Sequence, residues 1–217
     1  MNAISPVRNS LFILAADLDA ENALLGLLIR HQSPKTKPLK RNADFEIQTH
    51  PEHDSGCCTT GVAYLRSQLR QYDHAILLFD HHGSGRDHDR PEDIEADLDD
   101  QLSRNGWADR AQSIVISREL ETWVWSQSPH LESALNWSSQ QKLSDWLLAE
   151  RWVLPGEAKP RMPKEALHAA LGRQPKARFF LKLAEKVSFQ SCQDRAFVRL
   201  LTALRTWFPA TAPEDRS

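Results

Sequence analysis

The sequence predicts an α/β protein with a largely parallel central sheet, flanking helices and a C-terminal helical extension. In about the first 130 of its 217 residues, short apolar runs alternate with amphipathic stretches. This order is typical of strands and helices that wind a parallel sheet. Beyond that point only helical patterns occur. No internal repeat of about 20–50 residues is visible, which excludes solenoids and propellers.

Three short apolar runs and one segment of alternating apolar and polar residues are the candidate strands. The first has the sequence SLFILAA and the third HAILLF, and an aspartate follows each of them. Runs of this length and composition predict buried strands. In chain order the candidate strands are residues 10–16, 45–49, 74–79 and 113–116, and the second of them, FEIQT, is the alternating segment.

The segments between the strands carry apolar residues at helical spacing. Residues 60–72 place apolar side chains three or four positions apart, with Thr59 or Thr60 as the candidate N-cap. The acidic segment 91–104 opens with a proline, which is favourable at the first helical position. The predicted helices of this half are residues 21–30, 60–72, 91–104 and 119–127.

The second half predicts four further helices around the proline-rich segment 153–163. They are residues 143–152, 164–171, 178–187 and 196–207. We therefore divide the chain into an α/β domain at 1–130, a helical extension at 131–208 packed on the same core, and a frayed tail at 209–217.

Composition excludes several classes of protein. The net charge of −2 argues against nucleic-acid binding through bulk positive charge. No apolar stretch reaches the ~18–20 residues that a membrane span requires, and the first residues lack the pattern of a secretory signal. Three cysteines, two of them adjacent, do not form a disulfide framework. We expect a cytoplasmic protein without a membrane partner.

Acidic residues gather where the predicted strands end. Asp17 and Asp80 follow the two most apolar strands, Glu21 lies one helical turn beyond Asp17, and Glu121 comes shortly after the fourth strand. Ligands of open parallel sheets bind at the carboxyl ends of the strands. Carboxylate oxygens there suit Mg²⁺ and metal-assisted phosphoryl transfer. The alternative is that these acids only cap the helices that follow.

The chain resembles the Toprim family over about residues 10–207, and in particular the small stand-alone Toprim-like proteins of prokaryotic defence and mobile-element loci. The resemblance is carried by the runs LFILAADLDAENALLGLL, AILLFDHHGSGRD and IVISRELETWVWS. In that family a strand ends in an acid with a second acid one turn later, as Asp17 and Glu21 do. Asp80 falls on the first position of the family's DxD motif, and Glu121 before Trp123 is similar to its third acidic position.

The resemblance implies a divalent-metal-dependent phosphodiesterase, in particular a nuclease acting on DNA or RNA in anti-phage defence. Asp17, Glu21, Asp80 and Glu121 would then hold Mg²⁺ or Mn²⁺, with Glu21 and Asp80 acting in catalysis. The C-terminal stretch is similar to the Lys-bearing helical segment that ends the stand-alone proteins. In the apolar run FFLKLAEKV, Lys182 is the lysine that we place at the acidic edge as a phosphate contact.

Departures from the family pattern keep a second function open. Asp17 stands where the family has glutamate, Leu18 where it has glycine, and the DxD motif reads Asp80-His81-His82. Because imidazole suits Mn²⁺ or Zn²⁺ better than Mg²⁺, we expect His82 to be an auxiliary ligand and Mn²⁺ to be preferred, with Zn²⁺ the weaker candidate. The alternative function is a catalytically degenerate subunit or sensor of a larger defence complex. A nucleotide-binding module is disfavoured, because neither GxxxxGK[ST] nor GxGxxG is present.

Three further features each have a functional and a structural interpretation. The histidines and cysteines of residues 50–58 are potential zinc ligands, although their spacing matches no established motif. The seven tryptophans can stack on bases but more often fill a core. Basic residues cluster at 35–41 and 159–182, a local positive surface for a nucleic-acid backbone or a solvated face.

Overall fold

The computed structural model describes residues 9–30, 34–125, 128, 130–186 and 192–210. It contains a sheet of four parallel strands in the order β2-β1-β3-β4. The strands are β1 (Asn9–Ala15), β2 (Phe45–Thr49), β3 (Tyr72–Asp80) and β4 (Ala111–Ile116). The predicted α/β class, with its parallel sheet, flanking helices and C-terminal helical part, is confirmed.

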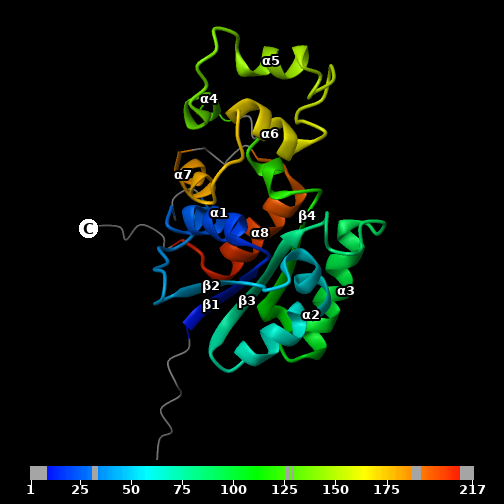
Figure 1. The fold of residues 1–217 in the computed structure, drawn as a ribbon. Coiled ribbons are helices and arrows are strands. Elements are labelled where there is room, and N and C mark those ends of the chain that lie inside the picture. Colours follow the sequence, from blue (N-terminus) through cyan, green and yellow to red (C-terminus); the bar gives the residue numbers. More distant parts are fainter. Residues whose placement is uncertain (1–8, 31–33, 126–127, 129, 187–191, 211–217) are drawn as a thin grey trace, which may run out of the picture.

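The two central strands are apolar because helices cover both of their faces. Leu11 and Ile13 of β1 point into one layer, and Phe12 and Leu14 point into the other, all with no exposed surface. This alternation follows from the two-residue period of a strand. Helices α1 (Leu18–Leu28) and α8 (Arg195–Trp207) cover the first face, and α2 (His53–Gln68) and α3 (Pro91–Arg104) cover the second (Figure 1).

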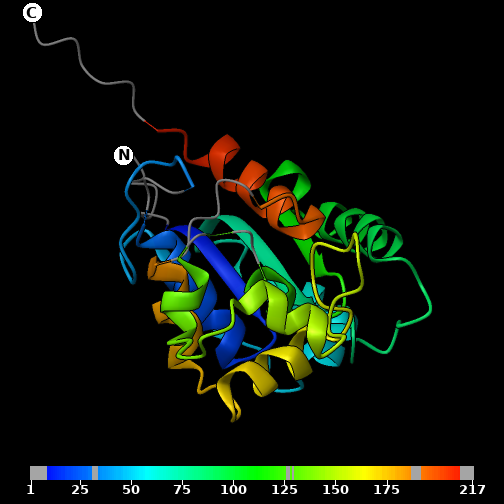
Figure 2. The same ribbon diagram turned by 90° about the horizontal axis from the view of Figure 1, so that it is seen from above.

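The helical extension packs on the face that α1 covers. Besides α8, it comprises α4 (Leu131–Leu135), α5 (Leu143–Ala149), α6 (Pro163–Leu171) and α7 (Arg178–Lys186). Seen from above, these helices lie over α1, and α8 runs beside them (Figure 2). A Cβ atom on Gly26 of α1 would lie 2.7 Å from Cβ of Ala184 and 2.8 Å from the carbonyl oxygen of Leu181. Glycine is therefore what lets α1 and α7 approach so closely.

Several predicted boundaries were wrong. Helix α2 begins at His53 rather than 60, and β3 begins at Tyr72, where the predicted helix still continued. The first turns of α2 carry small residues such as Gly56 and Cys57, which bury against the sheet without a strong apolar period. After β4 the chain forms the 3₁₀ helix η2 (Leu120–Trp123) rather than a long α-helix, and α4 was not predicted. The predicted positions 126–127, 187 and 211–217 lie outside the described residues.

Side chains of α3 bond to the backbone of the edge strand β4. The N–H of Val115 donates to Oε1 of Glu95 (2.8 Å), and the N–H of Ser113 donates to Oδ1 of Asp99 (2.8 Å). Glu95 is only 2% exposed. The unpaired backbone groups of an open strand edge can pair with a strand of another chain. Here the two carboxylates accept the hydrogen bonds that a fifth strand would otherwise accept.

Two arginines of α8 complete this edge. Arg195 donates to the carbonyl oxygen of Val115 and Arg199 to that of Ser113, each at 2.9 Å. Both arginines also form ion pairs with Glu95. The C-terminal helix is therefore joined to the sheet by charge-assisted hydrogen bonds as well as by its apolar face.

No helix in the described part of the chain combines the length and the apolar character needed to cross a bilayer. The buried tryptophans behave as core residues: Trp107 has no exposed surface, and Trp123 and Trp125 are 6% and 3% exposed. Trp125 Nε1 donates to the carbonyl oxygen of Pro163 (2.9 Å). This bond joins the segment after β4 to the start of α6.

Candidate functional site

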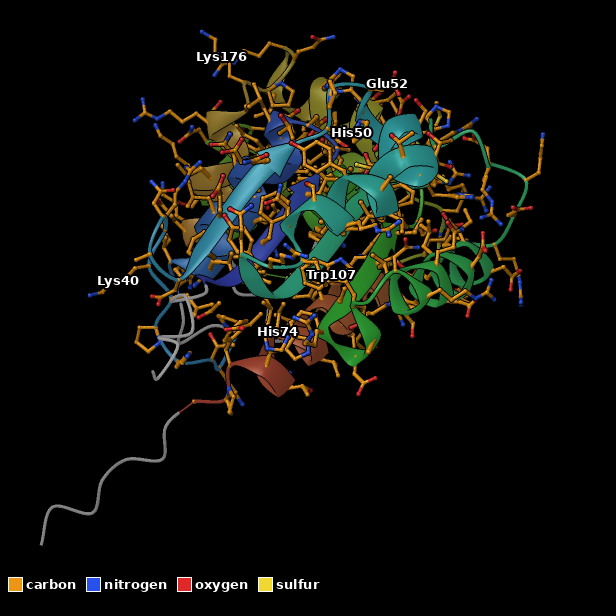
Figure 3. All side chains as sticks on the ribbon, turned by 90° about the horizontal axis from the view of Figure 1, so that it is seen from below. Lys40, His50, Glu52, His74, Trp107 and Lys176 are labelled. Atoms are coloured by element: carbon orange, nitrogen blue, oxygen red, sulfur yellow. The ribbon has the colours of Figure 1, made fainter. Side chains whose placement is uncertain are left out.

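The carboxyl ends of all four strands lie at one edge of the sheet because the strands are parallel. Figure 3 shows this polarity. His50 and Glu52, which follow β2, lie at one end of the sheet. His74, near the start of β3, and Trp107, which precedes β4, lie at the other end.

The strand register brings two predicted acids together at the carboxyl edge. Ala15 of β1 pairs with Leu78 of β3. Asp17 and Asp80 each stand two residues further along, so they emerge from neighbouring strands at the same level. Asp80 is in turn paired with Ile116, the last residue of β4.

Asp80 is the centre of an acidic group at this edge. Its backbone N–H donates to Oδ1 of Asp54 (2.8 Å), a residue in the first turn of α2. Burial raises the pKa of Asp80 well above its ordinary value. The negative charges of Asp54, Glu121 and Asp17 raise this pKa further. We call these four residues the carboxylate cluster.

Glu121 reaches the cluster from η2. Its side chain is only 4% exposed, and burial raises its pKa from 4.5 to about 7. The nearby Lys164 opposes this rise in pKa, and the negative charges of Glu119 and Asp19 add to it. A buried carboxyl group that titrates near neutral pH is a candidate for proton transfer or cation binding.

Two further aspartates belong to this environment. Burial raises the pKa of Asp54, and the charge of Asp17 adds to the rise. Burial and the charge of Asp17 also raise the pKa of Asp19, from 3.8 to about 6. Negative charge at this edge therefore exceeds what the neighbouring side chains compensate.

Asp17 has a structural role as well. It is the N-cap of α1, where its Oδ1 accepts a hydrogen bond from the backbone N–H of Ala20 (2.9 Å). The capping interpretation of this acid is therefore confirmed. Its negative charge also acts on Asp80 and Asp54.

Lys164, in the first turn of α6, is the cation that faces these acids. Burial acts against its charge, but Glu121 and Glu119 outweigh this effect and the pKa of Lys164 is raised. Asp80 and Asp17 contribute in the same direction. Because Trp125 is bonded to the neighbouring Pro163, the start of α6 is held close to η2.

The donor set fits a hard divalent cation in its chemistry: carboxylate oxygens, partly removed from water, with excess negative charge. Their arrangement is not that of a formed metal centre. Among the described residues, no three histidine, cysteine, aspartate or glutamate side chains are placed to hold one ion together. The cluster would need side-chain rotation to coordinate a metal.

Three residues predicted for the site lie elsewhere. Glu21 forms an ion pair with Arg41 (2.5 Å). His82 has a 74% exposed side chain, and its Nδ1 lies 3.2 Å from Oδ1 of Asp87. Lys182 is exposed because α7 turns its apolar side, not this residue, toward the core. Neither Glu21, His82 nor Lys182 is among the charges that act on Asp80 or Glu121.

The zinc interpretation of residues 50–58 finds no support in the described residues. His50 is buried, its Nε2 lies 3.0 Å from Oγ1 of Thr60, and burial lowers its pKa. Cys57 and Cys58 belong to the apolar layer beneath α2, and burial raises the pKa of both thiols. A thiolate, the form that binds zinc, is disfavoured there.

Sequence reasoning missed Asp54 and Lys164. Asp54 follows β2 after a short loop, so the rule that pointed to Asp17 and Asp80 applies to it equally. It was overlooked because α2 was predicted to start seven residues late. Nothing in the pattern around Lys164 distinguishes it from Lys182, since only the packing of α6 on η2 brings it to the acids.

Comparison of the chain with known protein families, curated proteins and solved structures found no match.

Proposed function

We propose that this protein is a divalent-metal-dependent phosphodiesterase of the Toprim type, a nuclease acting on DNA or RNA, with a role in anti-phage defence. The observation that carries the proposal is the carboxylate cluster at the carboxyl edge of a parallel sheet, faced by Lys164. The resemblance of Asp17, Asp80 and Glu121 to Toprim acids supports the same conclusion.

In this proposal Asp17, Asp54, Asp80 and Glu121 would hold the metal, which would supply polarisation of a phosphate oxygen and activation of water when bound. Lys164 takes the role first assigned to Lys182. Its ammonium group pairs with a phosphate oxygen and lowers the repulsion between an anionic substrate and the acids. A bound cation would also lower the pKa values that burial and like charge have raised.

The donor set changes the expected metal. With His82 exposed and beside Asp87, the remaining donors are carboxylate oxygens. Oxygen donors favour Mg²⁺ as well as Mn²⁺. We therefore expect His82→Ala to leave the affinities for both ions within about twofold of the wild type in calorimetric titrations.

A cleavage assay tests the proposed function. Single- and double-stranded DNA and RNA are incubated with the protein and Mg²⁺, Mn²⁺ or Zn²⁺. We expect Asp80→Asn to reduce the rate at least 100-fold, because the neutral amide weakens the cation site. The control is Asp109→Asn, the same change at an exposed aspartate in η1 (Ala108–Arg110), which lies before β4 at the amino end of the sheet.

Equal rates for wild type and Asp80→Asn would rule out this site. The second function, a catalytically degenerate subunit or sensor of a defence complex, is favoured by the absence of a formed metal centre among the described residues. It predicts no cleavage by the wild type with any of the three ions. It also predicts that Mg²⁺ and Mn²⁺ leave the melting temperature unchanged.

A further inference from the structure

A groove in the helical extension carries a concentration of positive charge. It has a volume of about 750 Å³ and is bordered by α4 with the loop after it, the end of α6, the α6–α7 loop and α7. Its cationic lining residues are Arg173, Lys176, Arg178, Lys182 and Lys186, and no aspartate or glutamate is among its lining residues in the described part of the chain. In Figure 3, Lys176 lies at the outside of the molecule, at the same end as His50 and the carboxyl end of β2.

The amphipathic pattern of α7 explains why cations line this groove. Phe180, Leu183 and Ala184 are buried. Arg178, Lys182 and Lys186 are four residues apart, so they follow one another along the opposite, exposed side of the helix. At 1.5 Å per residue this basic stripe extends over about 12 Å.

These cations are not neutralised within the described part of the chain. None of the five cationic lining residues forms an ion pair there. Basic residues elsewhere in the fold, such as Arg86, Arg195 and Arg199, do form ion pairs. The one acid of α7, Glu185, is not among the lining residues. A concave surface lined by one sign of charge attracts a ligand of the opposite sign.

Aromatic rings stand among the cations. Trp137 and Phe179 line the groove and are half-buried. Trp137 is held by a hydrogen bond from its Nε1 to the carbonyl oxygen of Gln141 (2.8 Å) and by its packing against Trp146 (5.1 Å between ring centroids). Phe179 packs on Phe180 at 5.5 Å. Fixed rings beside cations are the combination that binds unpaired bases and their phosphates.

We propose that this groove binds single-stranded nucleic acid, with the phosphates against the five cations and bases against Trp137 and Phe179. A duplex is disfavoured because its stacked bases cannot reach the rings, and an acidic peptide would not use them. The ligand class rests on the proposed nuclease function. The proposal adds a binding surface that is separate from the carboxylate cluster and prefers single strands.

Fluorescence anisotropy of a labelled 20-nucleotide oligo(dT) or oligo(U) tests the groove. The 217-residue chain is used in EDTA, so that neither cleavage nor a metal affects the result. We expect the triple variant Lys176→Glu/Arg178→Glu/Lys182→Glu to bind at least tenfold more weakly. Its slope of log K against log[salt] should fall by about 2, since each contact with a single strand contributes about 0.7.

The control reverses three exposed cations outside both basic clusters, Arg66→Glu/Arg70→Glu/Arg104→Glu, with the same change in net charge. We expect oligonucleotide affinity within twofold of the wild type. Circular dichroism melts establish that both triple variants fold.

A separate variant, Phe179→Leu, keeps an apolar side chain but removes the ring, and should weaken oligo(dT) binding at least threefold.

Three results would overturn the proposal: no oligonucleotide binding by the wild type, equal losses in the two triple variants, or equal affinity for oligo(dT), duplex DNA and poly-glutamate. Each of them leaves the Asp80-dependent cleavage test unaffected. Conversely, loss of cleavage with intact binding in EDTA would contradict only the catalytic site. The two proposals can therefore fail separately.

Discussion

The pH dependence of the unfolding free energy should reveal the cost of ionising the buried carboxylate cluster. The substitution Glu121→Gln isolates the part of this cost that comes from Glu121. Glu121 is 4% exposed, and its pKa in the folded protein is raised from 4.5 to about 7. This rise in pKa corresponds to about 3 kcal/mol of unfolding free energy, because each unit of pKa difference between the folded and unfolded states is worth about 1.4 kcal/mol. Glutamine is neutral at every pH and close in size to the protonated acid.

The sign of the effect follows from the direction of the shift in pKa. Because the folded-state pKa of Glu121 is higher than its value in the unfolded chain, ionisation disfavours the folded state. The penalty is absent below about pH 4.5, grows as the pH rises, and is complete above about pH 7. Relative to wild type, we expect Glu121→Gln to gain about 3 kcal/mol between pH 4.5 and 8.

The assay is urea unfolding followed by circular dichroism between pH 4.5 and 8.5 in EDTA. In thermal melts the same gain appears as about 6–12 °C, because 1 kcal/mol shifts the melting temperature of a chain of this size by about 2–4 °C. Glu150→Gln, at an exposed residue after α5, is the matched control and should follow the wild-type pH profile. Parallel profiles for Glu121→Gln and wild type would refute the assignment of Glu121 to a buried, like-charged environment.

Two further substitutions test the packing that positions the site. Glu95→Ala removes the acceptor of the Val115 N–H and leaves arginines of α8 without their buried partner, so it should cost about 3–5 kcal/mol in urea unfolding. The control is Glu92→Ala, because Glu92 also lies on α3 and pairs with Arg195 but is exposed. This control should lower the unfolding free energy by less than about 1 kcal/mol. Equal losses of stability in the two variants would contradict the role of Glu95 at the edge strand. Gly56→Ala would place Cβ 2.1 Å from Nδ1 of His50 and should lower the unfolding free energy by about 1–3 kcal/mol. An unchanged midpoint of urea unfolding would contradict this contact.

The sequence predicted the parts of the fold that depend on local pattern. Near-continuous apolar runs identified β1, β3 and β4, and the alternation of apolar and polar residues identified β2. Pro91 and the acidic first turn identified α3, whose bounds agree with the prediction. The start of α2 was missed because its first turns bury small residues, which give no apolar period. For the site, the rule of parallel strand ends sufficed to bring Asp17 and Asp80 to one edge, since strand direction and register determine that edge.

Side-chain partners, in contrast, were decided by tertiary packing. Glu21 and Lys182 have the residue types and the spacing of site residues, yet Glu21 pairs with Arg41 and Lys182 borders a basic groove. Lys164 faces the acids because Trp125 joins the start of α6 to the segment after β4.

The sequence by itself thus determined the layers, the strand ends and the excess of acids there, because these follow from hydrophobic period and chain direction. Only the tertiary structure decided which charges meet. A long side chain can turn to any of several partners, and the partner it reaches depends on helix contacts between residues far apart in the chain. The pairing of Arg195 with Glu95, which joins α8 to α3 and the edge strand, is of this kind.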